Sequence, residues 1–234
     1  MRITLVRHGE TTGQSSTRYF GATDIPLSST GRRQMRAVAA ALSSERFTAV
    51  YSSRLRRSKE AAELIADGAK ATAVEAFNEV DFGRWEGWTR DEIMAHDAEH
   101  YRLWQQSDES FCYPGGESRR GFRERVVAGL AAVTAARPEA NVLMVLHKGV
   151  IAVILAELLR LPSADRKALA IDLGSIHVIA RREEHWHALH LNRVDHLCSS
   201  PSLPRGGSGG GRTRRATADD LPLAPSLVRR GEHS

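Results

Sequence analysis

One stretch near the N-terminus is the most informative: Met1-Arg2-Ile3-Thr4-Leu5-Val6-Arg7-His8-Gly9-Glu10-Thr11. Its apolar, β-branched part predicts a buried strand over residues 2–7 that delivers Arg7 and His8 to a turn. Gly9 lets the backbone reverse, or approach a ligand, without a Cβ clash. The planar donors of an arginine suit phosphate, and a histidine is a nucleophile when its attacking nitrogen is neutral. Taken alone, the tripeptide Arg7-His8-Gly9 is equally consistent with an Arg and a His that merely cap the end of a strand.

Expected strands and helices alternate along the rest of the chain. Spaced apolar residues predict helices over 30–42, 57–67, 90–105, 118–136 and 149–160, and other apolar runs predict strands over 47–52, 71–75, 141–146, 175–181 and 186–191. This order is typical of one α/β domain, here a three-layer αβα sandwich with a mainly parallel central sheet. Sites in such sheets form beyond the carboxyl ends of strands. His8 and His147 both fall at that position.

The composition excludes several classes of protein. The chain has 234 residues, of which 41% are hydrophobic and 26% charged. This composition is typical of a soluble globular protein. No stretch approaches the roughly 18 consecutive apolar residues of a membrane span. Charged residues follow Leu5-Val6 at once, so we expect no signal peptide. The two cysteines, Cys112 and Cys198, lie far apart, which disfavours a disulfide framework and makes a reducing cytoplasm the expected location.

The basic charge belongs mainly to the end of the chain. Of 33 basic and 28 acidic residues, residues 199–234 hold six and three, which leaves 27 and 25, or +2, for residues 1–198. We therefore expect a folded domain over 1–198 and a flexible basic tail over 199–234 that is rich in Gly, Pro, Ser and Arg. A nearly neutral domain argues against a nucleic-acid-binding face on it.

The motif Leu5-Val6-Arg7-His8-Gly9-Glu10-Thr11 resembles the signature of the histidine phosphatase superfamily. That family includes cofactor-dependent phosphoglycerate mutases, α-ribazole phosphatases and broad-specificity acid phosphatases. The resemblance runs from residue 2 to about residue 197, and further motifs occur in the expected order. It implies a phosphoglycerate mutase-like fold, transient phosphorylation of His8, and binding of the phosphoryl group by Arg7.

Two further motifs imply more of a phosphoryl site. Ser53-Arg54-Leu55-Arg56-Arg57-Ser58 resembles the family's S-x-L-x-R-A segment, and alignment on Ser53 and Leu55 selects Arg57 over its neighbours Arg54 and Arg56. The start of a helix there also favours an anion. Val145-Leu146-His147-Lys148-Gly149-Val150 resembles the family's S-H-x-G-V element, with Leu146 in place of the usual Ser. The resemblance implies that His147 donates a hydrogen bond to the phosphoryl group.

A carboxyl is expected to protonate the leaving oxygen. The segment Asn78-Glu79-Val80-Asp81-Phe82-Gly83-Arg84-Trp85-Glu86-Gly87 resembles the phosphatase-type E-I-x-F-G-x-W-E-G pattern, which implies that Glu79 is this acid and later the base. Such an acid works best with a raised pKa, which the neighbours Phe82 and Trp85 could promote by desolvation. Asp81 has the same parity on an extended chain and is the competing candidate.

Four residues are candidates for substrate binding. Gln14 stands where most relatives have Asn, and its amide can still donate, from one methylene further out. Phe20 replaces the Thr of mutases, which weakens a mutase assignment, while the Gly21 backbone could still approach substrate. Lys148 adds positive charge at the rim, although an exposed solvated lysine is an equally good interpretation. In the loop Gly115-Gly116-Glu117-Ser118, contact with substrate and a helix N-cap by Ser118 are both open.

A metal centre is not expected. The cluster Glu183-Glu184-His185-Trp186-His187 puts two histidines on one face of a strand, but no third ligand stands at a suitable spacing. A solvated edge strand is the favoured interpretation, and we predict no metal and no cofactor.

The sequence thus predicts a metal-independent phosphomonoesterase that acts on a small phosphorylated substrate. Arg7, His8, Arg57, Glu79 and His147 would form its catalytic set. One alternative is a phosphoglycerate mutase, against which stand Phe20 and the absence of a long insertion between residues 87 and 114. The other is a non-catalytic phosphate- or protein-binding module on the same fold. We expect no nucleic-acid or membrane partner for the domain, and a homodimer is open.

Overall fold

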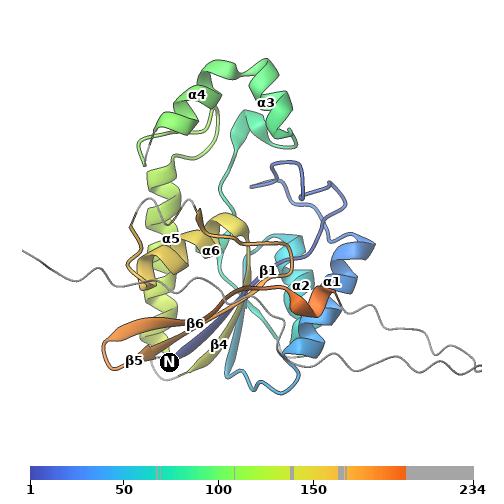
Figure 1. The fold of residues 1–234 in the computed structure, drawn as a ribbon, viewed down its shortest axis with the longest axis vertical. Helices are drawn as coiled ribbons and strands as arrows, with labels where there is room; N and C mark the ends of the chain where they lie inside the picture. The colour runs from blue at the N-terminus through green and yellow to red at the C-terminus, as the bar shows by residue number, and fades with distance from the viewer. Residues whose placement is uncertain are drawn as a thin grey trace, which may run out of the picture. The chain divides into compact units, whose positions relative to one another are not determined.

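A computed structural model describes residues 1–66, 68, 70–107, 109–137, 140–162, 166 and 168–198. The predicted tail over 199–234 lies outside the described residues. Figure 1 shows the described chain as strands and helices that alternate in sequence, with the strands gathered in one sheet.

The sheet is six-stranded, and it is built from β1 (Arg2–Arg7), β2 (Ala49–Ser52), β3 (Thr72–Ala73), β4 (Asn141–Leu146), β5 (Ile176–Arg182) and β6 (His185–Arg193). Its spatial order is β3-β2-β4-β1-β5-β6. The first four of these strands in that order pair in parallel, while β5 and β6 are antiparallel to their neighbours. The predicted α/β class with a mainly parallel sheet is confirmed.

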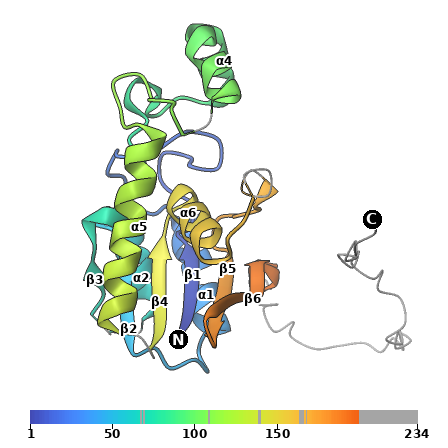
Figure 2. The same ribbon diagram turned by 90° about the vertical axis from the view of Figure 1, so that its left-hand side faces the viewer.

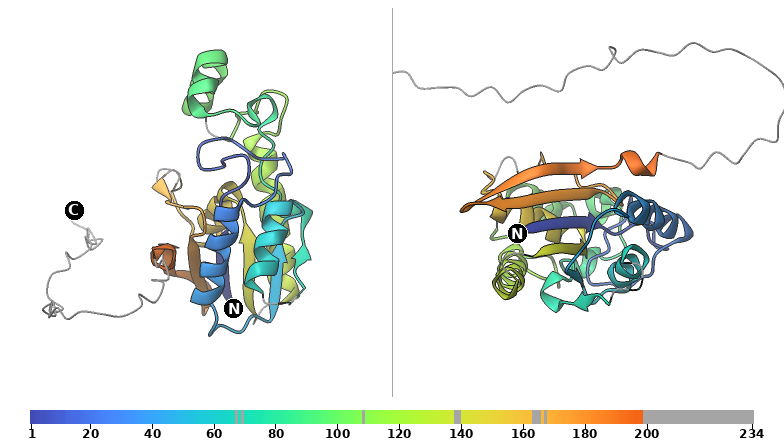
Figure 3. Two further views of the ribbon diagram at one scale, coloured as in Figure 1. Left: turned by 90° about the vertical axis from the view of Figure 1, so that its right-hand side faces the viewer. Right: turned by 90° about the horizontal axis from the view of Figure 1, so that it is seen from below.

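Helices cover both faces of the sheet, as Figures 2 and 3 show. On one face, α5 (Arg119–Ala136) and α6 (Lys148–Leu158) pack on Val142, Met144 and Leu146 of β4. On the other, α1 (Ser29–Ala41) and α2 (Arg56–Ile65) pack on Leu143 and Val145. Because successive side chains of a strand point to opposite faces, the unbroken apolar run of β4 serves both cores at once.

Beyond the carboxyl ends of the parallel strands lie α3 (Arg90–His96) and α4 (Ala98–Gln106) (Figure 1). The prediction of a single helix over 90–105 was wrong, because the chain breaks at Asp97 (φ −145°, ψ 46°). The Asp97 side chain is buried, and its carboxylate accepts a hydrogen bond from Trp85 Nε1 at 2.8 Å and lies 2.6 Å from His100 Nδ1. A buried carboxylate needs such partners, and reaching them takes Asp97 out of helical geometry.

The other predicted elements differ from the observed ones by a few residues at their ends. Short 3₁₀ turns at Glu75–Phe77, Gly83–Trp85 and Asp195–Leu197 complete the described structure. Among the described helices, none combines the length and the apolarity that crossing a bilayer requires.

Candidate active site

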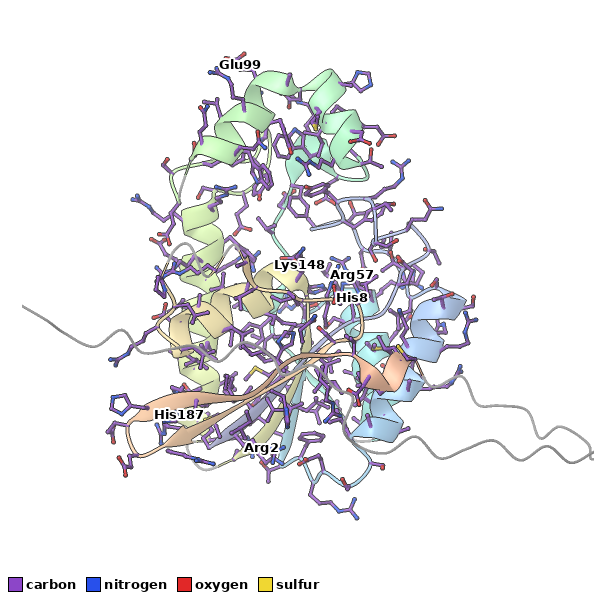
Figure 4. All side chains as sticks on the ribbon, viewed as in Figure 1. Arg2, His8, Arg57, Glu99, Lys148 and His187 are labelled. Carbon is purple, nitrogen blue, oxygen red and sulfur yellow. The ribbon has the colours of Figure 1, made fainter. Side chains whose placement is uncertain are left out.

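Two histidines meet where β1 and β4 end side by side. The strands pair in parallel with Arg7 opposite Leu146, so the next residue of each strand, His8 and His147, emerges at the same edge of the sheet. Their ring centroids are 5.1 Å apart, with the ring planes at 64°. Figure 4 shows His8 with Arg57 and Lys148 at this end of the sheet. Topology therefore assembles residues that are 139 positions apart in the chain.

The His8 ring is held in one tautomer. Its Nδ1 lies 2.7 Å from the Gly9 carbonyl oxygen. A carbonyl only accepts, so Nδ1 carries the proton and Nε2 keeps its lone pair. Burial lowers the pKa of His8 well below 6.5, and the nearby charges of Arg57 and Arg7 lower it further. The neutral imidazole with a free Nε2 is the form that can attack an electrophile.

Arg57 is fully buried at the start of α2, immediately behind His8. Its Nη1 donates to Thr23 O at 2.7 Å, and its Nη2 donates to Gly21 O at 2.7 Å and Phe20 O at 3.1 Å. Its Nε donates to His147 Nδ1 at 3.3 Å. A main-chain loop therefore fixes the guanidinium, whose charge acts on His8 at short range.

The hydrogen bonds of His147 differ from what the family resemblance implies. Because Arg57 can only donate, His147 Nδ1 accepts, and the proton is on Nε2, which donates to Ser53 Oγ at 2.7 Å. Both ring nitrogens are thus engaged by protein groups. In this structure His147 holds Arg57 in place, and it offers no free donor to a phosphoryl group.

Arg7 lines the cavity in front of His8, as Arg18 and Arg90 also do. Its Nη1 donates to Ile171 O at 2.8 Å, which fixes the side chain. Its Nε is buried, and among the described residues no group accepts a hydrogen bond from it. A buried N–H without a partner is costly unless a ligand supplies one. The Arg7 guanidinium therefore brings positive charge to the wall of the cavity.

Glu79 lies across the cavity from these cations and is only 7% exposed. Its Oε2 accepts from the Gly149 N–H at 2.9 Å, and its Oε1 accepts from the Val80 N–H at 3.0 Å. Burial raises the pKa of Glu79, and these hydrogen bonds and the charges of Arg57 and Arg7 oppose the rise. A Cβ at Gly149 would lie 2.4 Å from Oε1, so the carboxyl fits only against a glycine.

The competing carboxylate faces elsewhere. Asp81 accepts from the Gly83 N–H at 2.8 Å, which is a local turn contact, and it does not line the His8 cavity. Of the two aromatic neighbours, Phe82 lines the cavity, while Trp85 is buried and bonded to Asp97. The geometry brings Glu79, and not Asp81, to the histidines.

Glu86 is a supporting residue whose role the sequence did not reveal. Its carboxylate accepts from the backbone N–H groups of Gly21, Ala22 and Thr23. These residues belong to the loop whose carbonyls hold Arg57. A Cβ at Gly21 would lie 1.7 Å from the Val80 carbonyl oxygen, so only glycine allows this packing. Gly21 therefore serves to fix Arg57.

Arg125 is a second supporting residue that the sequence did not reveal. Its Nε and Nη2 bind both oxygens of Glu117, at 2.7 and 2.9 Å. Its Nη1 donates to Ala76 O and Asn78 O, and its Nη2 also donates to Glu79 O at 3.1 Å. All five N–H groups of the guanidinium are used. Arg125 thus clamps the backbone that carries Glu79.

The His8 cavity has a volume of about 300 Å³ and is lined by Arg7, His8, Ser15, Ser16, Thr17, Arg18, Tyr19, Phe20, Glu79, Phe82, Arg90 and Lys148. Of the four predicted binding residues, Phe20 and Lys148 line it. Gln14 is exposed and does not, whereas the three residues that follow it do. Ser118 caps α5 by accepting from the Gly121 N–H, and Glu117 pairs with Arg125, so neither lines this cavity.

Among the described residues, no group of three or more His, Cys, Asp or Glu is arranged to hold a metal ion. His187 lies at the far end of the sheet from His8 (Figure 4). The cluster over 183–187 is therefore remote from the cavity.

Known proteins resemble the chain over nearly the whole of the described part. The chain is 28% identical over 195 residues to an adenosylcobalamin/α-ribazole phosphatase of Escherichia coli, covering 82% of this chain and 91% of that one. It is 31% identical over 212 residues to a metal-independent phosphoserine phosphatase of Arabidopsis thaliana, covering 88% and 87%. The solved structure of a mycobacterial glucosyl-3-phosphoglycerate phosphatase in complex with VO3 superposes with a TM-score of 0.74 at 31% identity, covering 82% and 99%.

The model of the histidine phosphatase superfamily (branch 1) matches residues 3–194, so the resemblance of the motifs to that superfamily is confirmed. The chain belongs to branch 1 of the histidine phosphatase superfamily and is a phosphoric monoester hydrolase.

Proposed function

We propose that this chain hydrolyses the phosphate monoester of a small metabolite without a metal, through a phosphohistidine on His8. One observation carries the proposal: the Gly9 carbonyl holds the proton of His8 on Nδ1, which leaves Nε2 as a neutral nucleophile at the cavity. The phosphatase domain is proposed to span residues 1–198. A homodimer stays a prediction.

In the first step, His8 Nε2 attacks phosphorus and forms a P–N bond while the P–O bond to the alcohol breaks. Glu79, whose pKa is raised by burial, donates its proton to the departing oxygen. The guanidinium of Arg7, which lines the cavity, binds a non-bridging oxygen, and the fixed charge of Arg57 stabilises the negative charge nearby. His147 contributes by orienting Arg57.

In the second step, a water molecule attacks the phosphohistidine. The Glu79 carboxylate accepts the proton of that water, the P–N bond breaks, and inorganic phosphate leaves. Together, the two steps return Glu79 and His8 to their starting protonation states, so the cycle needs no reactant other than the ester and water.

Release of inorganic phosphate from a panel of monoesters tests the proposal. The panel should include phosphoserine and α-ribazole phosphate, because relatives are named for these substrates. It should also include 3-phosphoglycerate, followed both for phosphate release and for isomerisation. We expect phosphate release. Isomerisation without phosphate release would indicate the mutase, and a folded protein inert on every ester would indicate a binding module.

Metal independence gives the first further prediction. Because arginines, Lys148 and the neutral His8 line the cavity, hydrolysis of p-nitrophenyl phosphate should keep its full rate in EDTA. Vanadate should inhibit competitively, since its five-coordinate form resembles the transition state. Initial rates with and without each compound provide the measurement. A rate lost in EDTA and restored by a divalent ion contradicts the mechanism.

The pH dependence follows from two opposite shifts. His8 must be unprotonated to attack, and its pKa is lowered well below 6.5, so the acid limb of kcat/KM should lie below pH 6.5. Glu79 must be protonated, and its pKa is raised from 4.5, so activity should fall as the pH rises through that raised value. Glu79→Gln should remove this alkaline limb. An alkaline limb that persists in Glu79→Gln and disappears in Asp81→Asn contradicts the assignment.

Arg125→Lys tests the clamp on Glu79. A lysine has three donors where the guanidinium supplies five, so the carbonyls of Ala76, Asn78 and Glu79 lose partners and the carboxyl shifts. We expect kcat for ethyl phosphate to fall by about tenfold or more, since small misplacements of catalytic groups are costly. The loss for p-nitrophenyl phosphate should be smaller, because that alcohol leaves without needing the acid.

Arg120→Lys is the matched control, because Arg120 lies exposed on the same helix. It should leave both rates at the wild-type level. Equal losses on the two substrates in a folded Arg125→Lys protein would show that Arg125 does not act through Glu79.

A further inference from the structure

A second cavity adjoins the one in front of His8. It has a volume of about 480 Å³ and shares Tyr19, Glu79, Phe82 and Lys148 with the His8 cavity. We call it the aromatic compartment, because Tyr19, Phe82, Trp104, Tyr113 and Phe122 form much of its wall. Glu79 stands at the boundary between the two cavities.

The aromatic side chains of the compartment hold one another in place. Phe82 packs edge-on against Tyr19 and against Tyr113, with ring centroids 5.1 Å apart in both pairs. Trp104 Nε1 donates to the Tyr113 hydroxyl at 3.2 Å, so the polar atom of the indole has a partner within the wall. What remains facing the compartment is rigid apolar surface, which suits a flat apolar ligand.

Helix α6 supplies the opposite wall with small side chains. Ala152 and Val153 are adjacent in sequence, and Ala156 follows one helical turn later; all three line the compartment. Ala152 and Val153 are only partly buried, although both belong to an otherwise apolar face. The wall of the compartment therefore combines small residues of α6 with large aromatic rings.

The charges around the compartment are mostly neutralised. At the rim, Arg123 pairs with Glu157 at 2.8 Å and with Glu109 at 3.4 Å, and Arg166 approaches Glu109 at 3.6 Å. Arg119 stacks on Trp104 and donates to main-chain carbonyls. Lys148, at the boundary, forms no ion pair with an acidic side chain within the described part of the chain. The compartment is thus not built for a second anion.

We infer that the aromatic compartment receives the leaving alcohol, and that the preferred substrates are monoesters of alcohols with a flat aromatic body. This inference rests on the proposed function. With the phosphoryl group at His8, the oxygen that departs passes Glu79, which borders both cavities, and the body of the alcohol enters the compartment. Burying an aromatic body there lowers the free energy of the bound states by removing apolar surface from water.

A matched pair of substrates tests the inference. Naphthylethyl phosphate and ethyl phosphate release primary alcohols of similar acidity, because two methylenes insulate the ring from the oxygen. We expect kcat/KM to be at least about tenfold higher for naphthylethyl phosphate, as burial of one large apolar group predicts. Phosphoserine, whose body is polar and charged, should be no better than ethyl phosphate.

Two variants locate the effect. Ala152→Trp fills the compartment and should lower the naphthylethyl-to-ethyl ratio by at least about fivefold, toward the value expected without ring burial. Val153→Thr keeps the shape, adds a hydroxyl and should lower the same ratio by a smaller factor. Ala132→Trp, at an exposed position of α5, is the control and should leave the ratio unchanged.

The outcomes separate the two proposals. If no ester releases phosphate, the proposed function fails. If the esters are hydrolysed with a ratio near one, or phosphoserine is preferred, only the inference about the compartment is overturned. A high ratio that neither Ala152→Trp nor Val153→Thr lowers, in proteins shown to be folded by circular dichroism, also overturns it.

Discussion

Replacing His8 with alanine is expected to abolish phosphomonoester hydrolysis while the fold is retained. The imidazole supplies the only nucleophile of the proposed first step, and the arginines around it cannot replace a covalent intermediate. Removing a nucleophile from a cooperating set typically lowers kcat by a factor on the order of 10⁴ or more. We therefore expect kcat for p-nitrophenyl phosphate to fall by at least about 10⁴-fold, as measured by phosphate release.

The same prediction has a direct chemical readout. Wild-type protein that is mixed with substrate and quenched in alkaline denaturant should carry phosphate that acid removes and alkali does not, on His8. His187→Ala is a suitable control, because His187 lies at the opposite end of the sheet (Figure 4). It should keep both the rate and the labelling. A folded His8→Ala protein within tenfold of the wild-type rate would rule out the phosphohistidine.

The sequence predicted those parts of the site that a local pattern specifies. β1 and β4 are mostly apolar segments, and a histidine directly follows each, so the sequence alone indicates both the strands and the points at which they end. Parallel pairing then brings His8 and His147 together without further information. Motif alignment also selected Arg57 and Glu79, which the structure places beside His8 and at the cavity.

The supporting contacts could not be predicted in this way, because their partners are main-chain atoms far away in sequence. Arg125 is one of several arginines near the start of α5, and only the folded chain shows that it binds the carbonyls of Ala76, Asn78 and Glu79. Glu86 was visible as part of a motif, but its binding of the loop over 21–23 spans more than 60 residues. The break at Asp97 has the same origin, since a long-range bond to Trp85 overrides helix propensity.

The His147 contacts show a different limit. A motif can identify a histidine as part of a site, but the role of each ring nitrogen depends on its neighbours. Here the partners are Arg57 and Ser53, and they engage both nitrogens. The aromatic compartment likewise depends on tertiary structure, because its walls come from segments around residues 19, 82, 104–122 and 152–156.

The second large effect should distinguish the acid from the residues that bind phosphate. Protonating a poor leaving group matters more than protonating a good one, and a positioned general acid contributes about 10²–10⁴-fold. Glu79→Gln should therefore lower kcat for ethyl phosphate by about 10²-fold or more and should affect p-nitrophenyl phosphate much less. Glutamine keeps the size of the side chain, so its amide can still occupy the space against Gly149.

Arg57→Ala and Asp81→Asn complete the comparison. In the proposed mechanism Arg57 stabilises the phosphoryl group whichever alcohol departs, so its loss should lower both rates by similar factors. Melting curves should show that the loop it binds has stayed folded. Asp81 bonds to the turn at Gly83 and faces away from the cavity, so Asp81→Asn should change neither rate. If Asp81→Asn instead shows the dependence on the leaving group and Glu79→Gln does not, the two carboxylates exchange roles. The loop over 79–83 would then have to rearrange when substrate binds, because as described it points only Glu79 at the histidines.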